Sequence, residues 1–481
     1  MNDHAATEVP HGDFPLCVDL DGTLLKTDLL WESLLSTARE RPWTLLSLPL
    51  VLLRGRAAVK CFLAESAAID FGKLPYRDEV VAFVRSRRND GQRTFLTTAC
   101  TTRLANGVAK TLGLFDGIIA SDERHNLKGR VKATALIDKF GARGFDYVGD
   151  SRADIAVWAA ARHGFVAGSL RPANRDGEVI ERIPVERRAA DRFRAIARAL
   201  RPHQWVKNLL VFVPLIASHH VSDTAQLQSA LLAFAGFCLC ASSAYVLNDL
   251  LDVEADRAHP RKRLRPFASG DLSLVVGIAL CPLLLLCAVA IALALPPMLQ
   301  ATLAAYYVAT IAYSTVLKRK VMIDVITLAG LYTARIVGGG YAIAAPVSFW
   351  LLGFSMFLFL SIALVKRFTE FIVQERHAKG DVARRGYQIE DKPVVQSLGT
   401  ASGMVAALVL ALYINSDAVS ALYRHPSRLW FMCPLLLYWI GRMWIVAGRG
   451  KMHDDPLLFA ARDRMSYIVA ALLGVVVWLA T

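Results

Sequence analysis

The pattern of apolar and polar positions changes near residue 200. Before that point, short apolar runs such as "LCVDL" at 16–20, "RTFLTTA" at 93–99 and "FDYVGD" at 145–150 alternate with stretches of helical periodicity. Short strands that alternate with helices are typical of a parallel sheet covered by helices. The pattern therefore predicts a soluble α/β domain, which we place at residues 1–185.

From Trp205 onward, apolar stretches follow one another at intervals that suit membrane-spanning helices. Nine spans are predicted, at about 205–219, 227–247, 272–294, 297–316, 322–342, 346–365, 398–414, 428–446 and 464–480. Within this half, most of the Lys and Arg residues fall in the loops after the second, fourth, sixth and eighth spans. By the positive-inside rule, these loops and the N-terminal domain face the cytoplasm. We therefore expect a multi-pass protein of the inner (cytoplasmic) membrane with residues 202–481 as an all-α bundle.

Two further segments have a composition suited to a membrane surface. Residues 186–201, "ERRAADRFRAIARALR", form a basic helical linker. The apolar run from Trp43 to Leu53 is too short to span a bilayer. It is either a buried cap helix or a helix that touches the membrane through Leu45, Leu48 and Leu52, although Pro49 is a helix breaker.

Composition and charge support a membrane protein of at least two domains. The chain has 481 residues, of which 54% are apolar, and a net charge of +14. Because the basic residues lie between apolar spans, we expect no nucleic-acid partner. The eight cysteines form no CxxC pair and suggest reduced thiols. The N-terminus has no basic segment followed by an apolar run, so we expect no cleaved signal peptide. The oligomeric state is open, and a homo-oligomer is compatible with the sequence.

The first chemical site is predicted at the ends of the soluble strands. "VDLDGTL" places Asp19 and Asp21 on a tight turn after a strand, where one acid can attack phosphorus and the other can transfer a proton. "VGDSRAD" places Asp150 and Asp154 after another strand. Carboxylates in this arrangement suit Mg²⁺.

This ordered set resembles the haloacid dehalogenase superfamily over about residues 13–180. The resemblance implies a Rossmann-like phosphatase with a small helical cap at about 28–88, with Asp19 as nucleophile and Asp21 as general acid and base. It also implies phosphate binding by Thr98 (Thr97 being the less favoured choice) and by Lys132 (Lys128 being the alternative). The implied Mg²⁺ ligands are Asp19, Asp150 and Asp154.

The second site is predicted in "NDLLDVEADRAHPRKRLRP", which begins at Asn248. Asp249, Asp252 and Asp256 have the spacing of one helical face. Three acids at a membrane interface repel one another unless divalent metal neutralises them, and metal in turn binds diphosphate. The cations that follow can hold phosphate groups; they are Lys262, Arg263 and Arg265. The alternative is a solvated charged loop.

The second half resembles the UbiA superfamily of intramembrane prenyltransferases over about residues 195–481, which implies a nine-helix bundle with a central cavity. "RPHQWVKNLLVF", "YSTVLKRKVMIDV", "ALVKRFTEF" and "ARRGY" narrow the resemblance to the polyprenyl-phosphate phosphoribosyltransferase branch. The second aspartate motif of the superfamily is incomplete, because Leu328 stands where its second acid would be. Candidate phosphate-binding residues are Lys207, Lys318, Lys366, Arg367 and Arg385, and other candidate substrate-binding residues are Asn248, Asp324, Arg335 and Tyr387.

Together, the two resemblances predict a bifunctional Mg²⁺-dependent enzyme. The membrane half would transfer phosphoribose from phosphoribosyl diphosphate to a polyprenyl phosphate, and the soluble half would remove the 5-phosphate from the product. One alternative is a prenyltransferase that uses a prenyl diphosphate and an aromatic acceptor. Another is a non-enzymatic lipid transporter or scaffold.

Overall fold

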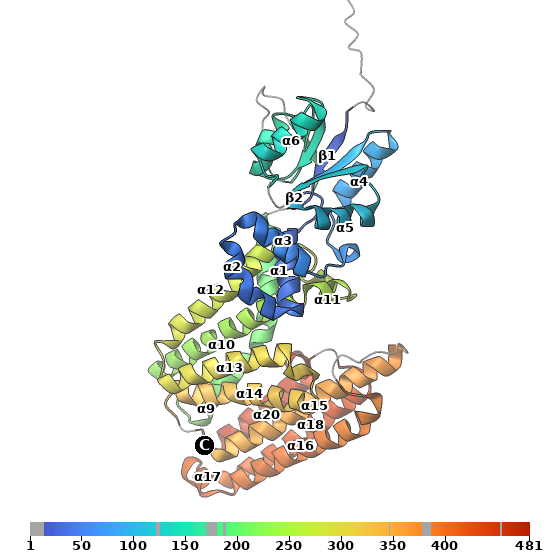
Figure 1. Ribbon diagram of the computed structural model, residues 1–481. Coiled ribbons are helices and arrows are strands. Elements are labelled where there is room, and N and C mark those ends of the chain that lie inside the picture. The colour runs from blue at the N-terminus through green and yellow to red at the C-terminus, as the bar shows by residue number, and fades with distance from the viewer. Residues whose placement is uncertain are drawn as a thin grey trace, which may run out of the picture. The chain divides into compact units, whose positions relative to one another are not determined.

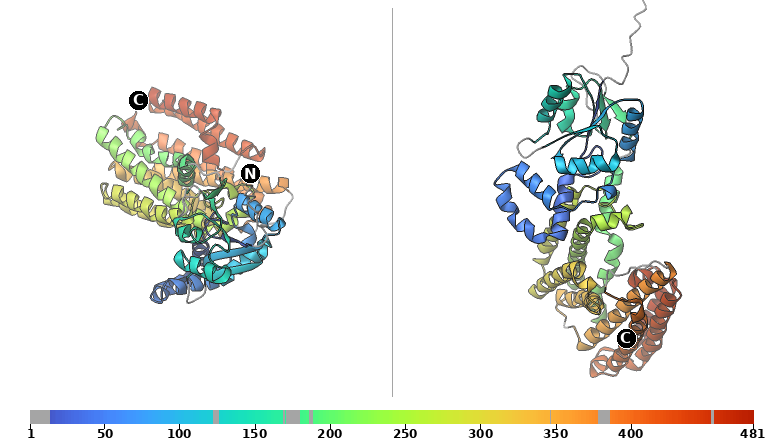
Figure 2. Two further views of the ribbon diagram at one scale, coloured as in Figure 1. Left: turned by 90° about the horizontal axis from the view of Figure 1, so that it is seen from above. Right: turned by 45° about the vertical axis from the view of Figure 1, so that its right-hand side comes forward.

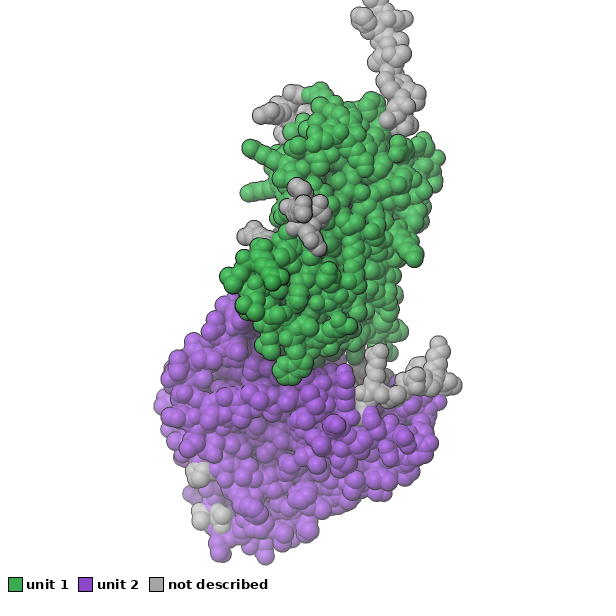
Figure 3. Space-filling model, in the orientation of Figure 1, with its two compact units in different colours: residues 1–199, 246–280 green, residues 200–245, 281–481 purple. Residues whose placement is uncertain are grey.

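A computed structural model describes residues 14–121, 126–168, 170, 180–185, 189–345, 347–377, 386–452 and 455–481 (Figure 1). The chain divides into two compact units, coloured separately in Figure 3. Unit 1 comprises residues 1–199 and 246–280, and unit 2 comprises residues 200–245 and 281–481. The soluble half is therefore not a unit by itself. It packs with residues 246–280, which contain the loop between the second and third predicted spans.

Unit 1 is built on a six-stranded sheet in which every pairing is parallel. The strand order is β3-β2-β1-β4-β5-β6, which places β1 near the centre. The strands are β1 (Leu16–Asp19), β2 (Thr94–Thr101), β3 (Gly117–Ser121), β4 (Asp146–Gly149), β5 (Gly164–Ala167) and β6 (Glu181–Ile183). The carboxyl ends of parallel strands meet at one edge, so residues that follow β1 and β4 come together there.

Helices cover both faces of the sheet, and Figure 1 shows α6 on the opposite side from α4 and α5. Alternate residues of β1 point to opposite faces. Leu16 and Val18 belong to one core cluster and Cys17 to the other. The helices are α4 (Asp78–Asn89), α5 (Thr102–Leu112), α6 (Arg130–Phe140) and α7 (Ile155–Trp158). The predicted α/β fold with a parallel sheet is confirmed.

A small helical cap lies between β1 and α4. Its elements are α1 (Leu29–Glu40), a 3-10 helix (Pro42–Ser47), α2 (Leu48–Leu52) and α3 (Arg56–Ser66). Pro42 and Pro49 each stand in the first turn of a short helix, where a missing N–H costs nothing. The predicted cap extended to residue 88, but α4 packs Val80 and Val84 into the core beside β1 and therefore belongs to the sheet layer.

Unit 1 also contains helix α8 and the charged motif. The basic segment is helical over Ala189–Leu200 and buries Ala195 and Ala199, while Arg198 pairs with Asp271 at 2.9 Å. Residues 186–188 lie outside the described residues. Asp249 lies near the end of α10 (Thr224–Leu251), Asp252 directly precedes the short helix α11 (Val253–Arg257), and Asp256 lies within α11.

Unit 2 is helical, and Figure 2 shows its helices running side by side as a bundle. The helices of the membrane half are α9 (Val213–Ala217), α10 (Thr224–Leu251), α12 (Leu274–Ala292), α13 (Pro297–Thr315), α14 (Ile323–Ala342), α15 (Phe349–His377), α16 (Lys392–Ile414), α17 (Asp417–Leu422), α18 (Met432–Gly448), α19 (Pro456–Ala460) and α20 (Arg464–Ala480). Of these, α10 and α12 have one end in each unit.

Five segments in the described part of the chain are long and apolar enough to cross a membrane. They are Thr224–Leu251, Leu274–Ala292, Phe349–Glu375, Ile389–Ile414 and Pro426–Gly448. A helical membrane part is therefore confirmed, whereas the count of nine spans stays a prediction. The first expected span, 205–219, is a 3-10 helix (Pro202–Phe212) followed by α9, and Pro214 stands at the start of α9. Gly339 allows α14 to approach this segment, because an added Cβ would lie 2.0 Å from the Val211 carbonyl oxygen.

Candidate active sites

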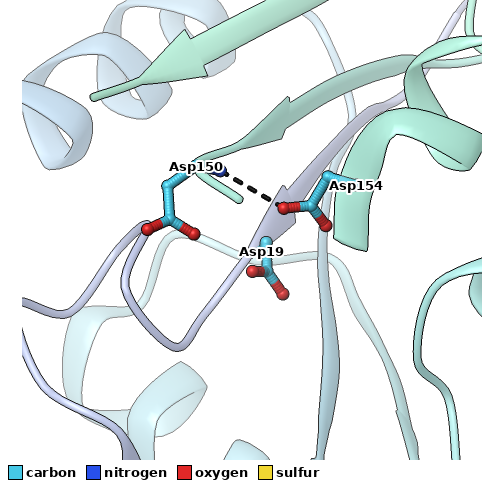
Figure 4. A group of neighbouring side chains, drawn as sticks. All are labelled: Asp19, Asp150 and Asp154. Carbon is cyan, nitrogen blue, oxygen red and sulfur yellow. Dashed lines mark hydrogen bonds between the residues drawn. The ribbon is translucent and has the colours of Figure 1, made fainter. Parts of the chain in front are cut away.

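Three carboxylates meet at the carboxyl ends of β1 and β4 (Figure 4). Asp19 ends β1, and Asp150 and Asp154 follow β4; each offers an oxygen within 4.8 Å of the other two. Asp154 is fixed by hydrogen bonds that it accepts from the backbone N–H groups of Asp150 (3.3 Å) and Ser151 (3.1 Å). An all-oxygen set of this kind is what Mg²⁺ takes, so these residues fit the predicted ion.

A buried lysine provides positive charge beside these three carboxylates, termed here the trio. Lys132 Nζ donates to Asp19 Oδ1 at 2.6 Å and to the Tyr147 hydroxyl at 3.1 Å, and it lies 3.8 Å from Asp154. Burial opposes its charge, but Asp19 and Asp154 raise the pKa of Lys132. Lys128, the alternative from the sequence, is exposed. The structure therefore brings Lys132 to the expected nucleophile.

Two neighbouring groups complete the first site. Thr98 is fully buried, and its Oγ accepts a hydrogen bond from the backbone N–H of Cys100 at 3.0 Å. Asp21 accepts from the backbone N–H of Leu29, the first residue of α1, at 2.9 Å. Burial and the nearby Asp28 raise the pKa of Asp21 well above its usual value. A raised carboxyl pKa favours the protonated form, which is the form that a general acid needs.

The cap supplies a cation that the sequence analysis missed. Lys60 Nζ, on α3, donates to the carbonyl oxygen of Ala99 at 2.7 Å and to Asn126 Oδ1 at 2.9 Å. Burial lowers the pKa of Lys60, while Asp21 and Asp28 oppose that shift. No local motif marks this lysine, because its position depends on how the cap folds over the end of β2.

Mg²⁺ should stabilise the protein more strongly at pH 7.5 than at pH 5.5. Burial and the charges of Asp19 and Asp154 raise the pKa of Asp150 to about 7. A raised carboxyl pKa means that the folded state holds its proton more tightly, so stability falls as pH rises from about 4, the unfolded value, towards 7. Mg²⁺ competes with that proton and offsets the loss. The measurement is the Mg²⁺-induced change in melting temperature at both pH values.

Asp150→Asn is the matched control for this prediction. It removes one charge from the trio and should reduce the Mg²⁺-induced change in melting temperature at pH 7.5. An equal Mg²⁺ response in the variant and the native protein would show that the ion binds elsewhere.

The second predicted site differs from its expected form. Helix α10 ends at Leu251, and Asp252 starts α11, so the three acids do not share one uninterrupted helix. Arg265 pairs with Asp249 at 3.1 Å and with Asp256 at 2.6 Å. Among the described residues, only the trio of the first site brings three acidic groups close enough for one metal ion. The metal role of the motif therefore stays a prediction. Lys262 and Arg263 are exposed beside it.

A buried ion pair joins the cap to this motif within unit 1. Arg257 donates to both carboxylate oxygens of Glu32, at 2.6 and 3.1 Å, and its Nε donates to the carbonyl oxygen of Ala268 at 3.1 Å. The side chains of Glu32 and Arg257 are only 5% and 6% exposed. Arg39, at the end of α1, lies 3.7 Å from Glu254. Because Arg257 follows Asp256 directly, the pair fixes the motif against the cap.

Removing Glu32 should therefore destabilise unit 1. Glu32→Ala leaves the Arg257 charge buried without its partner, a change that costs about 3–5 kcal/mol. The expected result is a lower melting temperature, and the double variant Glu32→Arg/Arg257→Glu should recover part of the loss. Lys73→Ala, at the exposed Lys73–Asp70 pair, is the control and should change little. Equal effects of Glu32→Ala and Lys73→Ala would contradict the role of the buried pair.

Unit 2 buries a second group of charges. Lys207 forms an ion pair with Asp455, and both are nearly inaccessible to solvent. Asp455 also caps α19 by accepting from the backbone N–H of Leu457 at 3.1 Å. Lys366 is half-buried and has no hydrogen-bond or ion-pair partner among the described residues. The sequence analysis missed Asp455; the Asp-Pro pair signals a helix start but not a partner for Lys207.

Asp324 and Arg335 both have partners inside the protein. Asp324 is fully buried; it accepts from the Tyr387 hydroxyl at 2.8 Å and lies 2.6 Å from Arg367. Arg335 donates to Asn208 at 2.7 Å and to the Tyr306 hydroxyl at 2.7 Å. These contacts favour a structural role for Arg335. Lys318 and Asn248 are half-buried, and Arg385 lies outside the described residues.

The fold and its buried charges define a membrane-embedded protein that also carries an acidic site on an α/β sheet. Residues 209–477 match the UbiA prenyltransferase family, and residues 16–158 match the haloacid dehalogenase-like hydrolases. The chain therefore belongs to the UbiA prenyltransferase family and has a haloacid dehalogenase-like N-terminal domain. Both resemblances stated from the sequence are confirmed.

Relatives match either the whole chain or its membrane half. The uncharacterized protein y4nM of Sinorhizobium fredii is 35% identical over 96% of this chain and 90% of its own length. Decaprenyl-phosphate phosphoribosyltransferase of Mycolicibacterium smegmatis is 30% identical over 57% of this chain and 88% of its own length. A solved UbiA homologue from Archaeoglobus fulgidus, bound to GPP and Mg²⁺, has a TM-score of 0.46 and 16% identity, and the match covers 59% of this chain and 99% of that one.

Proposed function

We propose that the chain is a bifunctional enzyme of the inner membrane whose two active sites face the cytoplasm. Its UbiA half transfers phosphoribose from phosphoribosyl diphosphate to a polyprenyl phosphate, and its N-terminal domain removes the 5-phosphate from the lipid-linked product. The observation that carries the proposal is one chain that joins a decaprenyl-phosphate phosphoribosyltransferase-like half to a complete phosphatase-like site. The full bundle of nine spans belongs to this proposal.

In the transfer step, an oxygen of the lipid phosphate forms a bond to the anomeric carbon of the ribose. The bond from that carbon to diphosphate breaks, and the diphosphate leaves with the electron pair. The lipid phosphate is already an anion, so no strong base is needed. Mg²⁺ held by Asp249, Asp252 and Asp256 would supply positive charge to the leaving group. Since Arg265 lies against two of these acids, we propose that it turns to the substrate phosphate when the metal binds.

Buried and half-buried cations of unit 2 suit the remaining negative charge of the substrates. Lys366 is the best candidate, because it is half-buried and lacks a protein ion pair, and such an ammonium group in the membrane part is costly unless an anion meets it. Lys207 forms an ion pair with Asp455, and Arg367 forms ion pairs with Asp324 and Glu370. Lys366 is therefore proposed to bind phosphate directly, whereas Lys207 and Arg367 act mainly in stabilising the fold through their ion pairs.

In the phosphatase step, a carboxylate oxygen of Asp19 forms a bond to phosphorus, and the bond from phosphorus to the 5-oxygen of ribose breaks. Asp21 gives its proton to that oxygen. Water then forms a bond to the phosphorus of the aspartyl phosphate and gives a proton to Asp21. The bond from phosphorus to the Asp19 oxygen breaks, inorganic phosphate leaves, and the Asp19 carboxylate is restored. Lys132, at 2.6 Å from Asp19, stabilises the charge of the phosphorylated enzyme. Mg²⁺ on Asp19, Asp150 and Asp154 would neutralise the phosphate group of the substrate.

Single substitutions should separate the two reactions. Asp19→Asn should still form lipid-linked ribose 5-phosphate but accumulate it, because the nucleophile is lost. Asp249→Asn should form no lipid product, yet it should dephosphorylate added lipid-linked ribose 5-phosphate. The measurement is mass analysis of lipid extracts after incubation of reconstituted protein with phosphoribosyl diphosphate and polyprenyl phosphate. Loss of both reactions in Asp19→Asn, with unchanged melting behaviour, would contradict two separate sites.

Lys366→Gln should weaken transfer selectively. A hydrogen bond to a charged group is worth about 1.5–3 kcal/mol, so kcat/KM for transfer should fall about 10- to 100-fold. The exposed Lys320→Gln is the control and should leave kcat/KM close to the native value. Dephosphorylation should be unchanged in both variants. An equal effect of the two substitutions would remove Lys366 from the substrate site.

A further inference from the structure

The helical cap carries a surface of large apolar side chains that no described part of the protein covers. Trp43 is 81% exposed, Leu46 74%, Leu50 69% and Leu53 85%. These four residues, termed here the apolar cap surface, lie on the 3-10 helix, on α2 and directly after α2, and neither element has a buried residue. Side chains of this size in so short a segment mark an interaction surface.

The exposed set differs from the helical face expected from the sequence. Leu45 and Leu48 are half-buried, and of the three leucines assigned to that face only Leu52 is exposed. The expectation assumed one regular α-helix. The 3-10 turns before Leu48 have a shorter repeat, and Pro49 forces a new helix start, so a different set of side chains faces outward.

Contacts inside unit 1 place this surface near the membrane boundary. The loop at 252–273 joins α10 and α12, which both belong to candidate spans, so its ends lie at the bilayer surface. Helix α1 is held to this loop by the Glu32–Arg257 and Arg39–Glu254 ion pairs. Trp43 follows Arg39 by four residues, which reach at most about 14 Å. The apolar cap surface therefore begins within a short distance of the membrane boundary.

The chemistry of the segment also suits lipid headgroups. Residues 41–64 contain no Asp or Glu, whereas Arg41 and Arg54 are exposed at the two ends of the apolar run. Basic residues at the edges of an apolar surface are attracted to anionic headgroups. A tryptophan at such an edge prefers the boundary between acyl chains and water. Eleven residues, from Trp43 to Leu53, are too few to cross a bilayer.

We propose that the apolar cap surface inserts into the headgroup layer of the same bilayer that holds the spans of this chain. The occupant of the surface is thus lipid and not a second protein. Insertion holds the cap at the membrane surface. The inference does not depend on the proposed reactions, because it rests on exposure, charge and the anchoring of α1.

The test is spin labelling of the full chain in liposomes that contain anionic lipid. Cys61, Cys281, Cys287 and Cys433 are accessible and are replaced by alanine, while the buried thiols stay because they do not react. Labels are placed at Leu50→Cys and Leu53→Cys in separate variants. Asp90→Cys, exposed at the end of α4, is the control. Power saturation then compares collisions with oxygen, which concentrates in lipid, and with a water-soluble nickel chelate.

Labels at positions 50 and 53 should collide with oxygen several-fold more often than with the nickel chelate, relative to the label at position 90. Ready access of the chelate to positions 50 and 53 would overturn the proposal, because the surface would then face water. Poor access of both reagents would also overturn it, because a protein contact would cover the surface. Two separate variants, labelled at positions 50 and 53, are used because one of the substitutions alone could perturb the fold of the cap.

Discussion

Buried charge is the constraint on which both halves of this protein depend. A carboxylate or a cation removed from water is costly unless an opposite charge meets it. Asp19 forms an ion pair with Lys132. Arg265 forms ion pairs with both Asp249 and Asp256, and Arg257 forms one with Glu32. Each ion pair joins residues from different elements of the fold. Forming the ion pairs therefore also fixes how those elements pack around each site.

The two candidate sites use this constraint in different ways. The first gathers three carboxylates within 4.8 Å of one another and leaves their repulsion only partly balanced by Lys132, which favours a divalent ion. In the second, Arg265 lies between Asp249 and Asp256 and offsets part of their charge, and the acids do not gather closely enough for one metal ion. The second site can therefore exchange its protein cation for metal and substrate, whereas the first, with its acids already together, gains stability when metal binds.

The Glu32–Arg257 pair gives the cap a structural role besides covering the Asp19 site. Its acid lies on α1, whose first residue holds Asp21, and its base follows Asp256 in the charged motif. One short helix therefore contacts elements of both candidate sites. This contact helps to hold residues 246–280 in unit 1 together with the soluble half. It also holds the motif acids and the cap together, and thereby keeps the two proposed active sites close.

Local patterns along the chain predicted the α/β character of the first half, the helical membrane character of the second and the strand-end positions of Asp19, Asp150 and Asp154. Those features follow from local periodicity and from the rule that parallel strands end at one edge. Three contacts became visible only in the folded protein: Lys132 and not Lys128 pairs with Asp19, Arg265 lies between Asp249 and Asp256, and Asp455 pairs with Lys207. These partners depend on packing between elements far apart in the chain, which no local pattern encodes. The exposed side of the cap was likewise set by 3-10 geometry and Pro49, because a change of helical repeat redirects every side chain that follows.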